Sequence, residues 1–275
     1  MRTVREFAQW IGLPEQVADC AQHCPLSAQE RRGYLSLFER DEAAFFEKVR
    51  AQPEPEQLAL CLFVQYAMER EAKWRAAGIP GQVYRDTMSD LALWYGECLR
   101  RTGKPGLVEW DWLALSLKGK LYRLGRLQYR PRILKDKITA AGRSFAAGVP
   151  MLEIHIPAGG PLRPQVVRSS MAQAWAFFEK GRPELMYCHS WLLSPALQQL
   201  LPQNSNILHF QSLFEVYDED FSFRQAEERV FGEIRNEIRA YPENTGLQKA
   251  LKQFLLGGGR VGMGAGVIPR GLPEK

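Results

Sequence analysis

Long apolar runs are missing from this sequence of 275 residues. The longest lies around residues 58–68 and is already interrupted by Gln65, whereas a helix needs about 20 apolar residues to cross a bilayer. The N-terminal residues lead into an amphipathic pattern and not into the apolar centre of a signal peptide. We therefore expect a cytoplasmic protein with no membrane partner.

Cysteine is also sparse. The five cysteines are an odd number and do not form the tight framework of a disulfide-rich protein. Cys20, His23 and Cys24 share one short stretch, but a zinc site needs further ligands nearby, and the other three cysteines are isolated in the sequence. We therefore expect reduced thiols and no bound metal.

Positive charge is unevenly distributed along the chain. Residues 100–143 contain 12 lysines and arginines against 3 acidic residues, within a formal net charge of +5 for the whole chain. Such a stretch can attract coenzyme A, nucleic acid or an anionic membrane surface. Its aromatic residues lie at the core spacing of helices and strands and not as a stacking series, so we expect no nucleic-acid partner.

The first hundred residues have the pattern of helices throughout. Ser27–Glu30 is a capping-box pattern, a long helix is predicted over 58–77, and another over 83–101. The cluster Thr102–Gly106 then indicates a linker. We predict a helical N-terminal domain over 1–108 and a second domain over 109–275.

The second domain is predicted to alternate strands with helices. After a short helix over 110–120, alternation of apolar and polar residues predicts strands over 121–130, 151–156, 185–193 and 214–217. Helices are predicted over 164–179, 224–239 and 245–256, and the glycines of 261–268 predict a last strand packed against backbone or a ligand. This order requires a mixed β-sheet flanked by helices, and the whole chain is expected to be α+β.

Residues 152–164 combine a strand, a glycine loop and the start of a helix. Gly159 and Gly160 allow backbone N–H groups to turn toward a ligand, and the helix that begins at Pro164 adds the positive end of its dipole. This arrangement is a phosphate cradle in physical terms, although such turns use glycine for geometry more often than for phosphate. It has neither the Gly-Lys-Ser/Thr end of a P-loop nor the three-glycine spacing of a dinucleotide fold.

Four motifs follow one another in a defined order and spacing. They are Leu124–Tyr129, His155–Leu162, Cys188–Pro195 and Leu201–Ile207. Together they resemble a bacterial family of acyltransferases with a helical N-acyltransferase N-terminal domain and a GNAT-like C-terminal domain. The resemblance covers most of the chain and is specific over 124–210, while the helical half matches in general character.

The resemblance implies that acyl-coenzyme A lies where two central strands splay apart, with its pyrophosphate on backbone amides of the following loop. The first such strand corresponds to residues 152–157, which include Ile156, and the second to residues 185–193. Gly159, Gly160 and Leu162 correspond to the pyrophosphate loop. The usual loop pattern of the superfamily, Gln/Arg-x-x-Gly-x-Gly/Ala, is reduced here to one adjacent glycine pair.

Two further residues are candidate cofactor contacts. Arg163 stands where a helix cap usually has Ser or Thr, and it is either a phosphate contact or a tolerated surface residue. Asn206 either bonds amides of the cofactor or caps a local turn.

Transfer of an acyl group to an amine needs a base for the amine proton and a donor for the oxyanion. His155 and His189 lie on the two strands that the resemblance places at the site, so either imidazole could be the base; the structural alternative for each is a hydrogen bond within a strand pair. Ser190 could donate a hydrogen bond or accept an acyl group. Glu153 shares a strand face with His155 and could be a base or the partner of Arg126, whose other candidate partner is a substrate carboxylate.

The resulting hypothesis is an acyltransferase that moves an acyl group from acyl-coenzyme A to an amine acceptor, a small-molecule substrate. The alternative is a GNAT-like sensor that has lost catalysis and binds a coenzyme A ester or another small anion. Binding without acyl release would distinguish the sensor from the enzyme.

Overall fold

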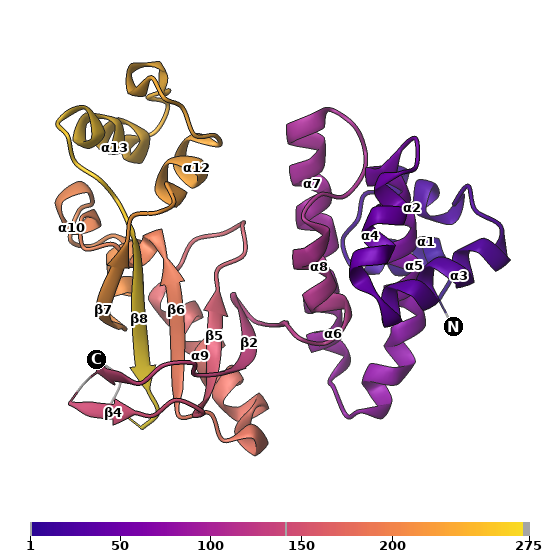
Figure 1. Cartoon of the computed structure of the whole chain (residues 1–275), viewed down its shortest axis with the longest axis horizontal. Coiled ribbons are helices and arrows are strands. Elements are labelled where there is room, and N and C mark those ends of the chain that lie inside the picture. The colour runs from indigo at the N-terminus through magenta and orange to yellow at the C-terminus, as the bar shows by residue number, and fades with distance from the viewer. Residues whose placement is uncertain (1, 141, 272–275) are drawn as a thin grey trace. The chain divides into compact units, whose positions relative to one another are not determined.

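The chain forms two compact units. The computed structural model describes residues 2–140 and 142–271, with the side chains of Gln16 and Cys20 excepted. The units comprise Met1–Leu124 and Gly125–Lys275 (Figure 1). The domain division between residues 108 and 109 stays a prediction, and the helix Trp110–Leu117 that follows it packs into the core of the first unit.

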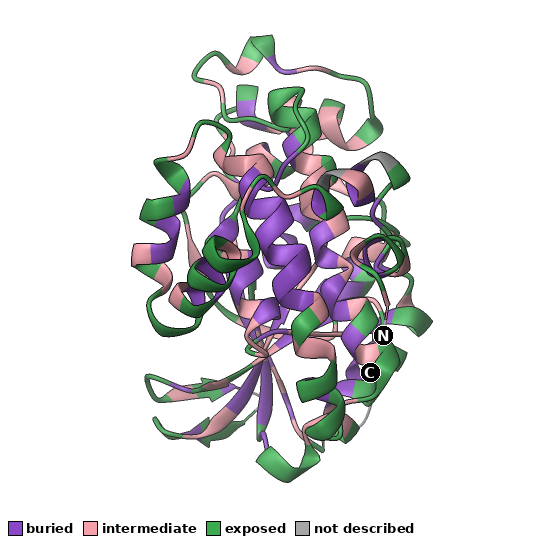
Figure 2. Ribbon diagram, turned by 90° about the vertical axis from the view of Figure 1, so that its right-hand side faces the viewer, coloured by how far each residue is buried: buried purple, intermediate pink, exposed green. Residues whose placement is uncertain are grey.

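The first unit is built from helices. Its elements are α1 (Val4–Trp10), α2 (Glu15–Gln22), α3 (Ala28–Arg40), α4 (Glu42–Arg50), α5 (Pro55–Ala76), α6 (Gly81–Met88), α7 (Asp90–Thr102), α8 (Trp110–Leu117) and the short strand β1 (Tyr122–Leu124). The central helix α5 is buried continuously from Leu58 to Ala67 (Figure 2). A helix that is apolar on every side has to be covered on every side, and the neighbouring helices do so here.

Aromatic rings fill the centre of this first unit. The ring centroid of Phe38 lies 4.8 Å from that of Phe45 and 5.2 Å from that of Phe63. Tyr66 meets Phe38 edge to face at 4.8 Å. Such tilted and edge-on pairs are favourable beyond the area that they bury, so this core depends on a few large rings.

Local capping explains where the helices begin. The Ser27 hydroxyl accepts a hydrogen bond from the Glu30 N–H at 3.3 Å, and the Glu30 carboxylate accepts one from the Ser27 N–H at 2.9 Å. This reciprocal pair confirms the predicted capping box. The single helix predicted over 83–101 is wrong, because α6 ends at Met88 and is followed by its C-cap Ser89, whose hydroxyl donates to the carbonyl oxygen of Asp86 at 2.7 Å.

The second unit is a mixed sheet with helices. Its strands are β2 (Leu127–Ile133), β3 (Ile138–Ala140), β4 (Arg143–Phe145), β5 (Pro150–His155), β6 (Leu185–Ser190), β7 (Glu215–Asp220) and β8 (Met263–Pro269). Its α-helices are α9 (Pro164–Phe177), α10 (Leu197–Leu200), α11 (Asn206–Gln211), α12 (Gln225–Phe231) and α13 (Gly246–Leu256), with short 3-10 helices at Glu179–Gly181, Trp191–Leu193 and Ile238–Ala240.

The sheet order is β1-β2-β5-β6-β8-β7, and β3 and β4 form a separate hairpin. β5 and β6 run parallel at the centre, while β2 pairs antiparallel with β5 and β8 pairs antiparallel with both β6 and β7. The predicted α+β fold with a mixed sheet flanked by helices is confirmed.

Two further predicted elements differ from the structure, and one hairpin was not predicted. The strand predicted over 121–130 is two strands, because Gly125 has a φ of +69° and turns the chain between β1 and β2. The helix predicted over 224–239 ends early, since Gly232 adopts a φ of +85° directly after α12. The hairpin of β3 and β4 carried too short an alternating pattern to be predicted.

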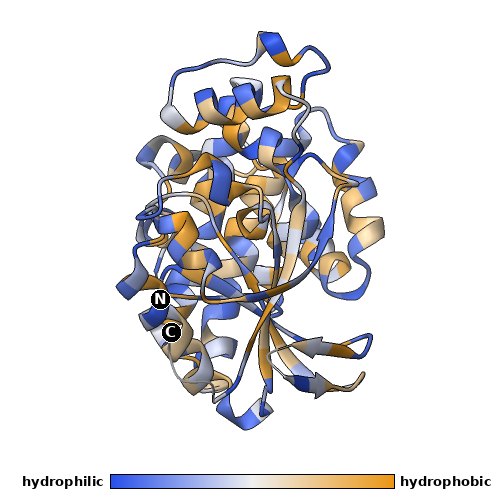
Figure 3. Ribbon diagram, turned by 90° about the vertical axis from the view of Figure 1, so that its left-hand side faces the viewer, coloured by the Kyte–Doolittle hydropathy of each residue, from blue (hydrophilic) through white to orange (hydrophobic). Residues whose placement is uncertain are grey.

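The two faces of the central sheet differ in character. One face carries Leu152, Ile154, Met186 and Cys188, all buried, within the apolar segments of the strands (Figure 3). The helix α9 covers this face, and its Ser170 hydroxyl lies 3.0 Å from the hydroxyl of Tyr129 on β2. The other face carries the side chains that alternate with these, and many of them are ionisable.

Glycines in β8 allow a close approach of backbone. A Cβ atom at Gly264 would lie 2.4 Å from the carbonyl oxygen of Leu193, and one at Gly266 would lie 3.0 Å from Cβ of Phe214. The last strand therefore packs directly against the 3-10 helix that follows β6, as the glycine pattern indicated.

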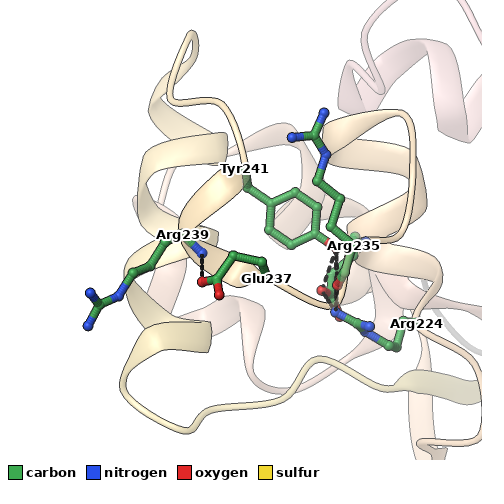
Figure 4. Close-up of polar contacts among 6 residues, drawn as sticks. Arg224, Arg235, Glu237, Arg239 and Tyr241 are labelled. Atoms are coloured by element: carbon green, nitrogen blue, oxygen red, sulfur yellow. Dashed lines mark hydrogen bonds and ion pairs between the residues drawn. The ribbon is translucent and has the colours of Figure 1, made fainter.

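A small helical lobe extends beyond one end of the sheet (Figure 1). Helices α10, α12 and α13 share an apolar cluster there that includes Tyr241 and Leu251. Figure 4 shows the polar network at its centre, where Arg224 donates to both oxygens of Glu227 and the Tyr241 hydroxyl donates to the same carboxylate at 2.8 Å. Because Glu227 is only 6% exposed, these partners have to offset the free energy that desolvation of its carboxylate costs.

Candidate active site

The two central strands separate along their length. β5 and β6 pair only at Met151 with Leu185, Leu152 with Met186 and Glu153 with Tyr187. Beyond this point β5 pairs with β2 alone, up to His155, and β6 pairs with β8 alone, up to Ser190. A wedge therefore opens between the C-terminal ends of the two strands, which are the strands that the family resemblance implied to splay.

The loop after β5 leads from this wedge into α9. Gly159 and Gly160 have φ values of +87° and +75°, and a Cβ atom would meet nothing within 4 Å at either position. The glycines are thus required by backbone conformation and not by crowding. Both are exposed, while Leu162 is buried and fixes the end of the loop, so the backbone N–H groups of this segment are accessible beside the start of α9.

Arg126 holds this loop from β2's side of the sheet. Its guanidinium donates to the carbonyl oxygen of Pro157 through Nη1 and to that of Gly160 through Nη2, both at 2.9 Å. Sequence reasoning offered Arg126 a protein carboxylate or a substrate carboxylate, and in the structure two backbone carbonyls accept these hydrogen bonds instead. The bond to the Pro157 carbonyl turns the N–H of Ala158, in the same trans peptide, away from Arg126, whereas the Gly160 carbonyl precedes Pro161, which has no N–H.

Glu153, His155 and Arg132 form a chain of charges on the polar face. Nε2 of His155 lies 3.6 Å from Oε2 of Glu153, and Nη1 of Arg132 donates to the same oxygen at 3.4 Å. All three side chains are between 21% and 30% exposed. Burial raises the pKa of Glu153, but hydrogen bonding to His155 and the charges of His155 and Arg132 outweigh it, so the pKa lies below its usual value.

A carboxylate with a lowered pKa is a weak base and a good partner for a cation. Glu153 is therefore suited to orient the His155 ring and to stabilise its protonated form. The sequence left Glu153 open as a base or as the partner of Arg126; the contacts of its carboxylate are instead with His155 and Arg132.

His189 lies on β6, across the wedge from His155. Side chains alternate along the strands, and Glu153 is the register partner of Tyr187, so His155 and His189 both lie on the polar face. His189 is exposed. Bonds from the backbone and hydroxyl of Ser222 lower the pKa of Asp220, and the charge of His189 contributes to the same shift.

Ser190 and Cys188 point the other way. The Ser190 hydroxyl is buried and accepts a hydrogen bond from the Leu192 N–H at 3.2 Å, which caps the following 3-10 helix. Cys188 is completely buried, and burial raises the pKa of its thiol far above the usual value. The structure does not bring Ser190 together with the histidines.

The remaining candidates lie around α9 and α11. Arg163 is exposed at the start of α9, and its side chain makes no capping bond there. Asn206 is the first residue of α11, and the capping role at this turn belongs to Ser205, which accepts from the Leu208 N–H at 3.1 Å. Ile156 follows directly after β5 at the mouth of the wedge.

Sequence reasoning missed two residues of this site. Arg132 completes the charge chain with Glu153, and Ser170 accepts a hydrogen bond from the Leu127 N–H at 3.1 Å and so attaches α9 to the sheet. Arg132 lies in the alternating segment that continues from the predicted strand, so the register of β2 against β5 would have found it. Nothing local distinguishes Ser170 from other small helix residues.

Neither a metal-binding cluster nor a membrane-spanning helix occurs in the part of the chain that the structure describes. No group of three or more His, Cys, Asp and Glu side chains there could hold a metal ion, and none of the described helices is long and apolar enough to cross a membrane. A concavity of about 1200 Å³ in the second unit is lined by Arg143, Lys180 and Arg182 among others and by none of the predicted site residues.

The sequence matches two family models in succession. Residues 2–119 match the N-acyltransferase N-terminal domain, and residues 121–268 match the GNAT-like C-terminal domain. No curated protein matches the sequence.

Solved acyltransferase structures share this fold. One in complex with decanoyl-CoA gives a TM-score of 0.79 at 23% identity, over 98% of this chain and 88% of that chain. A mutant acyltransferase in complex with octanoyl-CoA gives 0.78 at 23% identity, over the same shares. An acyltransferase in complex with decanoyl-CoA and teicoplanin gives 0.77 at 22% identity, over 97% of this chain and 87% of that chain.

Proposed function

The chain belongs to the family of N-acyltransferases with a GNAT-like C-terminal domain, and on that premise we propose that it moves an acyl group from acyl-coenzyme A to an amine acceptor. The observation that carries the proposal is the wedge between β5 and β6, which opens beside a glycine loop whose carbonyls are held by Arg126. The acyltransferases of the same fold that hold octanoyl-CoA and decanoyl-CoA support the choice of cosubstrate.

The wedge suits the pantetheine and thioester of the cosubstrate. Backbone groups of β5 beyond Glu153 have no ladder partner on β6, so they are available to an extended ligand. The accessible N–H groups of Gly159 and Gly160 and the start of α9 would bind the pyrophosphate.

At the carbonyl carbon of the thioester the reaction forms one bond and breaks one. The amine nitrogen attacks the thioester carbonyl, the C–N bond forms, and the C–S bond breaks with the electron pair leaving on sulfur. The amine loses a proton to a base, and the coenzyme A thiolate takes up a proton as it leaves. Holding amine and thioester together supplies much of the rate.

We assign the base to His155. Its ring has Glu153 as a partner, which in turn is bonded to Arg132, and the carboxylate stabilises the imidazolium that forms when the amine proton is taken. The described contacts include no hydrogen bond or ion pair between His189 and a carboxylate, although its charge acts on Asp220, and its position across the wedge suits contact with the acceptor.

The test is release of free coenzyme A thiol by the full chain, with acetyl-, octanoyl- and decanoyl-coenzyme A and a panel of primary amines. The proposal expects thiol release that requires both acyl ester and amine, together with an acylated amine in the product mixture. Tight binding of the esters without amine-dependent release would overturn it in favour of the sensor, and absence of binding would overturn both.

A further inference from the structure

The helical unit has a concavity of its own. It has a volume of about 420 Å³ and is lined by residues of α3, α5, α8 and β1 and of the segments that follow α5 and α8. All of its lining residues lie in the first unit. The volume falls in the range of small-molecule sites, which is roughly 300–1,000 Å³.

The wall of this concavity is aromatic. Tyr66 and Trp74 are 3% and 8% exposed, and the rings of Trp74 and Tyr122 lie 5.2 Å apart. Gly119 adopts a φ of +68°, and a Cβ atom there would lie 3.3 Å from both the Trp74 ring and the Tyr122 hydroxyl. The chain thus passes close to these rings without a side chain, and a flat apolar group suits the surface that they form.

The rim is positively charged. Arg70, Lys73, Lys118 and Lys120 contribute cations to it. Glu42 forms ion pairs with two of them: its Oε1 lies 2.7 Å from Nζ of Lys118 and 3.6 Å from Nζ of Lys120.

The cations of the rim outnumber the nearby carboxylates. Glu39 is paired with Arg70 and accepts the hydroxyl of Tyr66. No ion pair is recorded for Lys73 among the residues that the structure describes, and its side chain lies on an exposed position of α5. Four cations therefore face two carboxylates, which favours an anionic ligand.

We propose that the helical unit binds a planar aromatic carboxylate in this concavity, at a site separate from the wedge of the second unit. The ring of the ligand lies against Trp74 and Tyr122, and its carboxylate accepts charge-assisted hydrogen bonds from Lys73 and Lys120. A polyanion without an apolar body gains little from the aromatic wall, and a neutral ring gains little from the rim.

The experiment uses two matched probes on the full chain, 2-naphthoate and its neutral isostere 2-naphthamide, each titrated by calorimetry. We expect the carboxylate to bind about tenfold or more tightly than the amide, because the charge-assisted bonds are lost with the charge. No heat with naphthoate, or equal affinity for the two probes, would overturn the proposal.

Two double variants locate the bound probe. Lys73→Gln with Lys120→Gln should weaken naphthoate binding about tenfold, at an unchanged melting temperature, because Glu42 keeps Lys118. The control, Lys180→Gln with Lys249→Gln, removes the same charge from exposed positions of the second unit and should leave the affinity unchanged. Equal loss in both variants, or full binding in the first, would place the probe elsewhere and overturn the proposal. None of these measurements depends on acyl transfer.

Discussion

The centre of the first unit and the polar face of the central sheet in the second unit are built from different groups. In the first unit Phe38, Phe45 and Phe63 pack ring against ring at its centre. In the second unit ionisable side chains lie half-buried along a central strand, where Glu153 connects His155 and Arg132. The aromatic packing stabilises the fold. The half-buried charges cost free energy of desolvation, and such groups are concentrated at functional sites. The difference supports our proposal that the chemistry takes place in the sheet unit.

The largest effect should follow from opening the aromatic core. Phe63→Ala should lower the free energy of unfolding by about 3–5 kcal/mol, since Phe63 is fully buried and leaves a cavity. Urea unfolding measures the loss, and Leu99→Ala, at a position 42% exposed, is the control with a change within about 0.5 kcal/mol. An equally small loss for both variants would show that the rings do not carry the stability of this unit.

The next largest effect should appear in turnover. His155→Gln should reduce kcat about a hundredfold, because a positioned base is lost, while the affinity for acyl-coenzyme A stays nearly unchanged. Steady-state rates at several pH values provide the measurement, because raised pH supplies neutral amine and partly rescues the variant. His189→Gln is the matched control and should mainly raise the KM for the amine. A larger loss of kcat in the control than in His155→Gln would reverse the assignment.

A smaller effect, on the affinity for acyl-coenzyme A, should follow from removing the clamp, by which we mean the two hydrogen bonds from Arg126 to the carbonyls of Pro157 and Gly160. Arg126→Met removes both hydrogen bonds to the loop and should weaken acyl-coenzyme A binding about tenfold, as the loop loses its fixed orientation. Arg163→Met removes an exposed arginine with no capping bond at the start of the same helix and serves as the control. Equal weakening in the two variants would indicate general attraction of the phosphates and not orientation of the loop.

The buried network of the helical lobe should show a smaller change in stability. Tyr241→Phe removes the hydroxyl that donates to Glu227 and accepts from the Arg235 N–H at 2.7 Å. Because Arg224 still pairs with Glu227, the loss should be about 1 kcal/mol, measured by urea unfolding. A loss no larger than that of an exposed substitution would mean that solvent replaces the hydroxyl.

The smallest effect concerns acid stability. The pKa of Glu153 is lowered in the folded state, so its contribution is present above the pKa of the unfolded chain and is lost as the pH falls through the folded value. Urea unfolding of wild type and Glu153→Gln should therefore differ more at pH 7 than at pH 3. A difference that does not shrink in acid would contradict the lowered pKa.

The sequence predicted the fold where local chemistry decides it. The capping box at Ser27, the proline that begins α9 and the alternation of β5 depend on neighbouring residues, and they stand in the structure as predicted. The turn at Gly125 was missed because the alternation of residues continues across it. The pattern of apolar and polar residues does not reveal that φ becomes positive at a single glycine.

The site was less accessible to sequence reasoning because its partners are distant in the chain. Arg126 bonds carbonyl oxygens 31 and 34 positions away, and every residue has a carbonyl, so no residue type identifies the partner. The wedge depends on where pairing of β5 and β6 stops, which is a property of the sheet. The candidate residues could be named, but their grouping into a clamp and a charge chain required the fold.

The most direct measurement of the central claim is a calorimetric titration of the full chain with decanoyl-coenzyme A at low and raised salt. If the wedge and the clamped loop bind the ester, the titration will give saturable heat at one site per chain, weaker at raised salt because phosphate contacts are screened. Saturating ester will also raise the melting temperature. A titration with neither heat nor a shift in melting temperature would contradict the account.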